Sequence, residues 1–78
     1  MLIQVFGPGC ANCKRLEDTS RKAIEELNLN AELLKVQSID AMVAAGVMRT
    51  PALGIDGKIV IQGRVPSVEE IKKLLQQN

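Results

Sequence analysis

The chain has 78 residues, with 10 Lys and Arg against 9 Asp and Glu, one aromatic residue and two cysteines. This length suits a single small domain, residues 1–78, whose margin of stability is thin. A formal net charge of +1 gives no basis for a nucleic-acid or membrane partner, and one phenylalanine provides no stacking platform for bases.

The first half of the chain begins with a predicted strand, loop and helix. Residues 2–6 form a short apolar run typical of a buried strand, and Gly7-Pro8-Gly9 ends it in a loop. From Ala11 to about Asn28, side chains that can face inward recur every three or four residues, as on one face of a helix. They are Cys13, Leu16, Ser20, Ala23, Ile24 and Leu27.

A second strand and a short helix follow. Ala31 to Val36 reads as a strand, and its charged residues Glu32 and Lys35 indicate the edge of a sheet. Ser38 has the chemistry of an N-cap for a helix from Ile39 to Ala45, which Gly46 would end. We expect the apolar side chains of this helix to face inward: Ile39, Met42 and Val43.

The last third predicts a hairpin and a closing helix. Ala52 to Ile55 and Lys58 to Gln62 are strands joined by Asp56-Gly57, a strong two-residue hairpin signal. Ser67 and Glu70 have the spacing of a capping box. We expect the final helix to bury its apolar residues: Val68, Ile71, Leu74 and Leu75.

Both cysteines fall where the first strand gives way to the first helix, in Gly9-Cys10-Ala11-Asn12-Cys13. A helix N-terminus exposes unpaired N–H groups and the positive end of the peptide dipoles, so it favours an anion such as a thiolate. A loop this short adds little stability as a structural disulfide. The sequence has no transmembrane run or signal-peptide pattern, so we expect a cytoplasmic protein, in which a CxxC is redox-active or metal-binding.

The first helical turn is basic, with Lys14 and Arg15 and no acid before Glu17. Cations here oppose the helix dipole at a cost of about 0.3–1 kcal/mol each, but they would stabilise a nearby anion. We therefore hypothesise that the pKa of Cys10 is lowered. The alternative is that both cations are screened surface charges without consequence.

Taken together, these features resemble the thioredoxin fold over essentially the whole chain: the CxxC, Thr50-Pro51 before the third strand, the hairpin and the closing helix. The Gly-Cys-Ala-Asn-Cys motif, with Gly63-Arg64-Val65 before the last helix, is most similar to small thioredoxin- and glutaredoxin-like redox-disulfide proteins of prokaryotes. The resemblance implies an α/β fold in the order βαβαββα, with three helices flanking a four-stranded mixed sheet. Its strand order would be second, first, third, fourth, with the first two parallel and the hairpin antiparallel to them.

The same resemblance implies a thiol–disulfide oxidoreductase that carries electrons through a Cys10–Cys13 disulfide and binds no other cofactor. Cys10 would be the attacking nucleophile and Cys13 the resolving thiol. The inward-facing position of Cys13 on the helix agrees with limited access to substrate. Four neighbours would support the loop and the helix start: Gly9, Ala11, Asn12 and Lys14.

Thr50-Pro51 is the second feature that the resemblance interprets. An X–Pro bond is cis in only about 5–6% of folded cases, which favours an ordinary loop proline. The family instead places a cis-proline beside the CxxC. In relatives the preceding residue offers backbone groups to an extended substrate segment, a role that falls to Thr50, and Arg49 would attract acidic groups.

The implied partners are disulfide-containing target proteins and a separate reductase similar to thioredoxin reductase, with the chain acting as a monomer. Three departures from the family stand out. Gly9 and Ala11-Asn12 replace the usual Trp and Gly-Pro, and Gly63-Arg64-Val65-Pro66 does not reproduce the glutathione motif of glutaredoxins. The buried acid of thioredoxins also lacks a counterpart, because the first strand offers only Gln4 and the chain has no His, so water or substrate would take the proton.

Two other functions compete with this interpretation. Small copper-chaperone domains also carry a CxxC after their first strand, and two thiolates suit linear Cu(I), whereas a closed zinc site needs four ligands. Those domains run βαββαβ and end on a strand, whereas this chain is expected to end on a helix. The third possibility is a thioredoxin-like interaction module without catalysis, in which replacing both cysteines would leave function intact.

Overall fold

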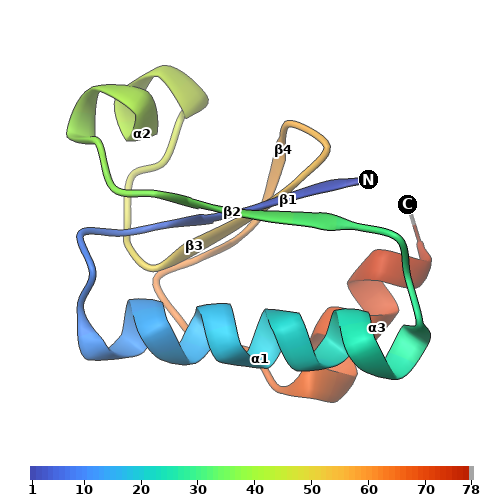
Figure 1. The fold of residues 1–78 in the computed structure, drawn as a ribbon. Helices are drawn as coiled ribbons and strands as arrows, with labels where there is room; N and C mark the ends of the chain where they lie inside the picture. Colours follow the sequence, from blue (N-terminus) through green and yellow to red (C-terminus); the bar gives the residue numbers. More distant parts are fainter. Residues whose placement is uncertain (78) are drawn as a thin grey trace.

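The computed structural model describes residues 1–77, which form a four-stranded sheet with helices on both faces (Figure 1). The order of elements is the predicted βαβαββα, and the second strand starts one residue later than expected. In chain order they are β1 (Leu2–Phe6), α1 (Ala11–Leu27), β2 (Glu32–Val36), α2 (Ile39–Ala45), β3 (Ala52–Ile55), β4 (Lys58–Gln62) and α3 (Val68–Gln76).

The strands lie in the order β2-β1-β3-β4. β1 is parallel to β2 and antiparallel to β3, and β3 pairs with β4 as an antiparallel hairpin. These relations confirm the fold that the resemblance implied, and β2 is an edge strand, as its charged residues indicated. At the hairpin tip, Asp56 and Gly57 have φ angles of 49° and 88°, the paired positive values that a type I′ turn requires.

The helices begin and end at the predicted signals. The Ser38 and Ser67 hydroxyls accept hydrogen bonds from the N–H groups of Ala41 (3.3 Å) and Glu70 (3.2 Å), so each caps its helix. Asn28 and Gly46 end α1 and α2 in the left-handed conformation. None of the helices within residues 1–77 is long and apolar enough to cross a bilayer.

Two hydrophobic clusters occupy opposite faces of the sheet. Figure 1 shows α1 and α3 on one face and α2 on the other, near the end of the sheet where α1 begins. The smaller cluster, under α2, consists of Phe6, Met42 and Ala52. The larger one, under α1 and α3, consists of Ile3, Val5, Leu16, Ala23, Leu53, Ile55, Ile61, Ile71 and Leu75.

One sequence prediction about the core is wrong. Ile39 and Val43 were expected to face inward, but they are 72% and 71% exposed, whereas Met42 is 6% exposed. The reason is the small area that α2 covers. A helix of seven residues lies over a small apolar patch around Phe6 and Ala52, which Met42 fills, and the ridge formed by positions i and i+4 is left in solvent.

Candidate active site

The two cysteines stand at the start of α1 and differ sharply in accessibility. Cys10 is the N-cap residue and is exposed, whereas Cys13, one turn into the helix, is 5% exposed. A disulfide bond joins them, with their Cα atoms 5.0 Å apart. Gly9 has a φ of 93°, a backbone angle that favours glycine, and this turn delivers Cys10 from the end of β1 to the helix start.

The helix start directs its unpaired donors at the Cys10 sulfur. The backbone N–H of Cys13 donates a hydrogen bond to Cys10 Sγ at 3.2 Å, and the first turn contains no acidic residue. When the disulfide is reduced, the same donor and the positive end of the helix dipole favour a thiolate on Cys10. Ala11 and Asn12 are exposed first-turn residues, and the N–H of Lys14 closes that turn onto the Cys10 carbonyl at 3.0 Å.

Gly7 connects the end of β1 to the cysteines through close contact. A Cβ added at this buried residue would overlap Cys13 Sγ and lie 3.9 Å from the Thr50 Cβ. The missing side chain therefore lets Cys13, Gly7 and Thr50 lie together. The sequence analysis treated Gly7 only as a strand breaker. The feature of the sequence that could have indicated this contact is the position of Gly7, directly after a buried strand and before the CxxC.

The segment before β3 is hydrogen-bonded to β4. The Thr50–Pro51 peptide bond is cis, and Pro51 is buried while Thr50 is exposed. The Gln62 side-chain oxygen accepts hydrogen bonds from the N–H groups of Met48 (2.8 Å) and Arg49 (3.2 Å). Gln62 thus positions the loop that carries Thr50, a role that the sequence analysis missed because it depends on a contact across the sheet.

Arg49 is directed along the same loop. Its Cβ and Cδ would lie 3.4 and 3.2 Å from a Cβ built on Gly63, so the stem of the side chain packs over that glycine. The Gly63 N–H donates to the Pro51 carbonyl at 2.8 Å. Arg49 and Thr50 therefore lie on one exposed segment, in which Arg49 packs over Gly63 and Thr50 lies beside Gly7, the glycine that adjoins Cys13.

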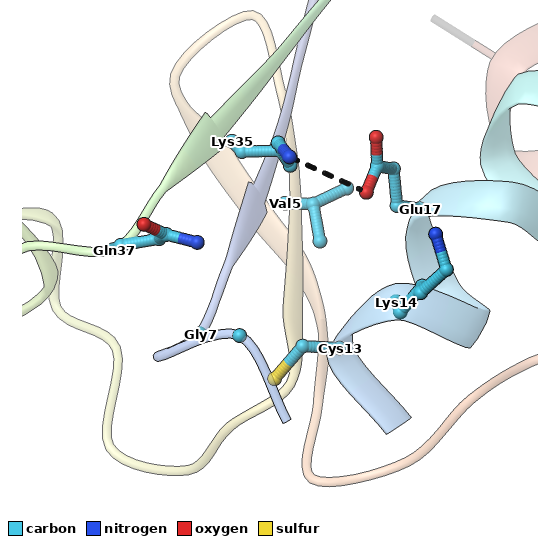
Figure 2. Close-up of a pocket in the computed structure, with 8 residues that line it drawn as sticks. Val5, Gly7, Cys13, Lys14, Glu17, Lys35 and Gln37 are labelled. Atoms are coloured by element: carbon cyan, nitrogen blue, oxygen red, sulfur yellow. Dashed lines mark ion pairs between the residues drawn. The ribbon is translucent and has the colours of Figure 1, made fainter. Parts of the chain in front are cut away.

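A cavity of about 170 Å³ opens between the start of α1 and the C-terminal ends of β1 and β2. Figure 2 shows Cys13 at one end and the Glu17–Lys35 ion pair at the other. The cavity is lined by Val5, Gly7, Gly9, Cys13, Lys14, Glu17, Lys35 and Gln37.

Glu17 is the second residue that the sequence analysis missed. Its side chain is 14% exposed and pairs with Arg21 at 2.8 Å and with Lys35 at 3.9 Å. This acid lies on α1, whereas the first strand offers only Gln4. The helical spacing from Cys13 to Glu17, four residues, was the signal that could have identified it.

Within residues 1–77, no three or more His, Cys, Asp or Glu side chains gather in an arrangement that could hold a metal ion. The chain also ends its described part on α3 rather than on a strand, unlike the βαββαβ order of the copper-chaperone domains considered above.

Comparison with known proteins gives concordant results. The model of the family described as the thioredoxin domain matches residues 1–76. A protein of Methanothermobacter thermautotrophicus named thioredoxin is 48% identical over 75 residues, covering 96% of this chain and 97% of the relative. A second protein named thioredoxin, from Methanocaldococcus jannaschii, is 41% identical over 76 residues, covering 97% of this chain and 87% of the relative.

Proposed function

Since the chain belongs to the thioredoxin family and is a thiol–disulfide oxidoreductase with a redox-active Cys10–Cys13 disulfide, we propose how its residues divide the reaction. Cys10, as thiolate, attacks one sulfur of a target disulfide, so that a mixed disulfide forms and one target thiolate leaves. Cys13 then attacks Cys10 Sγ, which forms the Cys10–Cys13 disulfide and releases the second target thiolate. The dithiol is oxidised, and the target gains both electrons.

The contrast between the two sulfurs carries this assignment. Cys10 is exposed and accepts the N–H of Cys13 at the helix start, whereas Cys13 is 5% exposed and lies against Gly7. An attacking thiol needs both thiolate character and access to its target. The exposure and helix-start position of Cys10 support it as the attacking thiol, and the burial of Cys13 beside it supports Cys13 as the resolving thiol.

Target binding is proposed for the loop that ends at the cis peptide bond. Thr50 is exposed and lies beside Gly7 and Cys13, so its backbone groups can pair with an extended target segment next to the reacting sulfurs. Pro51 directs the chain from Thr50 into β3. Arg49, at the other end of this exposed segment, would favour targets with acidic residues. Gly9, Ala11, Asn12 and Lys14 hold the cysteine loop and the helix start.

Family membership implies disulfide-bearing targets and a reductase that restores the dithiol. We further propose that the reductase resembles thioredoxin reductase and that the targets are proteins. Residues 1–78 would act as one domain and as a monomer in the cytoplasm, where an isolated CxxC is kept available for exchange. The single sheet shared by both hydrophobic clusters supports the assignment of one domain.

Trapping of mixed disulfides tests the proposed roles. In Cys13→Ser, Cys10 should form mixed disulfides with target proteins that persist until a reducing agent is added. Cys10→Ser is the matched control, because it removes the other sulfur and should trap no targets. Equal trapping by the two variants, or trapping by Cys10→Ser alone, would refute the assignment.

A further inference from the structure

The second step of the reaction raises the question of where the proton of Cys13 goes. A thiol must lose its proton before it can attack a disulfide. Cys13 is 5% exposed, and its sulfur lies against the Gly7 backbone. Burial disfavours the charged thiolate, so this step benefits from an acceptor that is reached from inside the fold.

The cavity beside Cys13 contains one such acceptor. Two of its lining residues, Lys14 and Lys35, carry ammonium groups, which donate hydrogen bonds but accept none, and Gln37 does not titrate. The remaining lining residues besides Cys13 are a valine and two glycines. Glu17 is thus the single lining residue with a carboxylate.

We propose that Glu17 accepts the proton of Cys13 when Cys13 resolves the mixed disulfide, an inference that rests on the roles of the cysteines proposed above. Glu17 follows Cys13 by one helical turn, so both side chains face the same cavity. The cavity volume of about 170 Å³ is several times the roughly 30 Å³ that a water molecule occupies in the liquid. The proton can therefore pass from sulfur to carboxylate through water.

Two cations pair with the carboxylate of Glu17 and orient it. Arg21 on α1 pairs with it at 2.8 Å, and Lys35 on β2 pairs with it at 3.9 Å. Lys14 on α1 lines the same cavity. Figure 2 shows the ion pair between Glu17 on α1 and Lys35 on β2.

The step balances in atoms and electrons. The Cys13 thiol transfers its proton to Glu17, and the resulting thiolate attacks Cys10 Sγ. The Cys10–Cys13 bond forms as the bond from Cys10 to the target sulfur breaks. The target leaves as a thiolate. Glu17 returns to its carboxylate form by giving its proton to this thiolate, or by giving it to solvent while solvent protonates the thiolate.

Stopped-flow oxidation of the reduced protein by a chromogenic dithiobis-nitrobenzoate separates the two steps. Attack by Cys10 releases the first nitrothiolate at a rate proportional to reagent concentration. Resolution by Cys13 releases the second nitrothiolate at a rate that does not depend on the reagent concentration. Glu17→Gln is compared with Asp18→Asn, which removes the same charge from the next, exposed position of α1, and with Glu17→Asp, which keeps a carboxylate.

In Glu17→Gln we expect the first phase to stay within about twofold of wild type and the second to slow by about tenfold or more near neutral pH. The rate of the second phase in Glu17→Gln should then rise continuously with pH. The second phase of Asp18→Asn should match wild type, and Glu17→Asp should recover part of the rate. A purely electrostatic role predicts the opposite sign, because removing a negative charge near Cys13 favours its thiolate. If the second phase of Glu17→Gln is as fast as that of Asp18→Asn, the proposed role of Glu17 is overturned. If wild type shows no first phase, the result contradicts the proposed role of Cys10 instead.

Discussion

The backbone N–H of Cys13 donates a hydrogen bond to the sulfur of Cys10 at 3.2 Å, so Cys13 stabilises the neighbouring sulfur through its own main chain. Cys10 thereby occupies the N-cap position usually held by Ser, Thr, Asp or Asn. In the mechanism proposed above, this N-cap residue is also the attacking group. The proposed reactivity of Cys10 therefore depends on its position at the start of α1.

This arrangement predicts unequal reactivity of the two thiols. Cys10 in reduced Cys13→Ser should be alkylated by iodoacetamide at least about tenfold faster than Cys13 in Cys10→Ser, because only Cys10 is both accessible and placed at the helix start. Mass spectrometry of timed samples measures both rates. Unfolding in urea serves as the control, since the two thiols should then react alike. Equal rates in the folded variants would contradict the structural contrast.

Gly7→Ala should destabilise the fold, because its Cβ would overlap Cys13 Sγ. We expect a loss of about 1–3 kcal/mol in the free energy of unfolding, as for other overpacked sites, measured in urea on the reduced protein. The same substitution in a Cys13→Ala background should cost clearly less, because the sulfur is gone. If the cost is the same in both backgrounds, the contact with Cys13 is not its cause.

Gln62→Ala should loosen the loop before Pro51 by removing the acceptor for the N–H groups of Met48 and Arg49. Because these groups are exposed and can bind water, we expect a stability loss of only about 0.5–1.5 kcal/mol. KM for a protein disulfide should nevertheless rise severalfold, while alkylation of Cys10 stays unchanged. Gln62→Glu keeps the acceptor and should restore KM, and Gln76→Ala on exposed α3 surface is the neutral control. An unchanged KM in Gln62→Ala would exclude a role for this loop in target binding.

The ion pair before α3 predicts a pH dependence of stability. Arg64 donates two hydrogen bonds to the Glu70 carboxylate, one of 3.0 Å between Nη1 and Oε1, and they hold the pKa of Glu70 below its ordinary value. Because the folded-state pKa is the lower one, the pair stabilises the fold above the unfolded value of about 4.3. That stabilisation is lost as the pH falls through the folded value.

Urea unfolding of wild type and Glu70→Gln across this range measures the effect. The difference between their free energies of unfolding should be present at neutral pH and shrink toward zero in acid. It should be small, because the side chains of Arg64 and Glu70 are 54% and 40% exposed. Glu25→Gln, at an exposed position of α1, should show no such trend. A difference that does not change with pH would mean that the carboxylate charge is not its source.

Much of the fold was predictable from local chemistry. The serine caps, the left-handed residues that end α1 and α2, and the Asp56-Gly57 turn act within a few residues of sequence, so each boundary could be read directly. The strand order depends on contacts between distant segments, and it came from family resemblance. The predicted orientation of α2 was wrong because three apolar residues in a short helix do not specify which of them packs against the sheet.

The site was predictable only where its chemistry is local. The exposed and buried positions of Cys10 and Cys13 follow from the start of one helix. The loop contact of Gln62 and the proposed role of Glu17 depend on another strand or on a shared cavity, so both side chains looked like ordinary surface groups in the sequence. Gly7 looked like a loop residue because the sulfur that fills its missing side chain comes from the next element.

The most direct test of the account is a thiolate titration of Cys10 by ultraviolet absorbance. Reduced Cys13→Ala leaves Cys10 as the only thiol and keeps the backbone N–H at position 13. We predict a pKa below the value of about 8.5 for an unperturbed cysteine, in the range found at helix N-termini. A pKa at or above that value would contradict the claim that the start of α1 activates this sulfur.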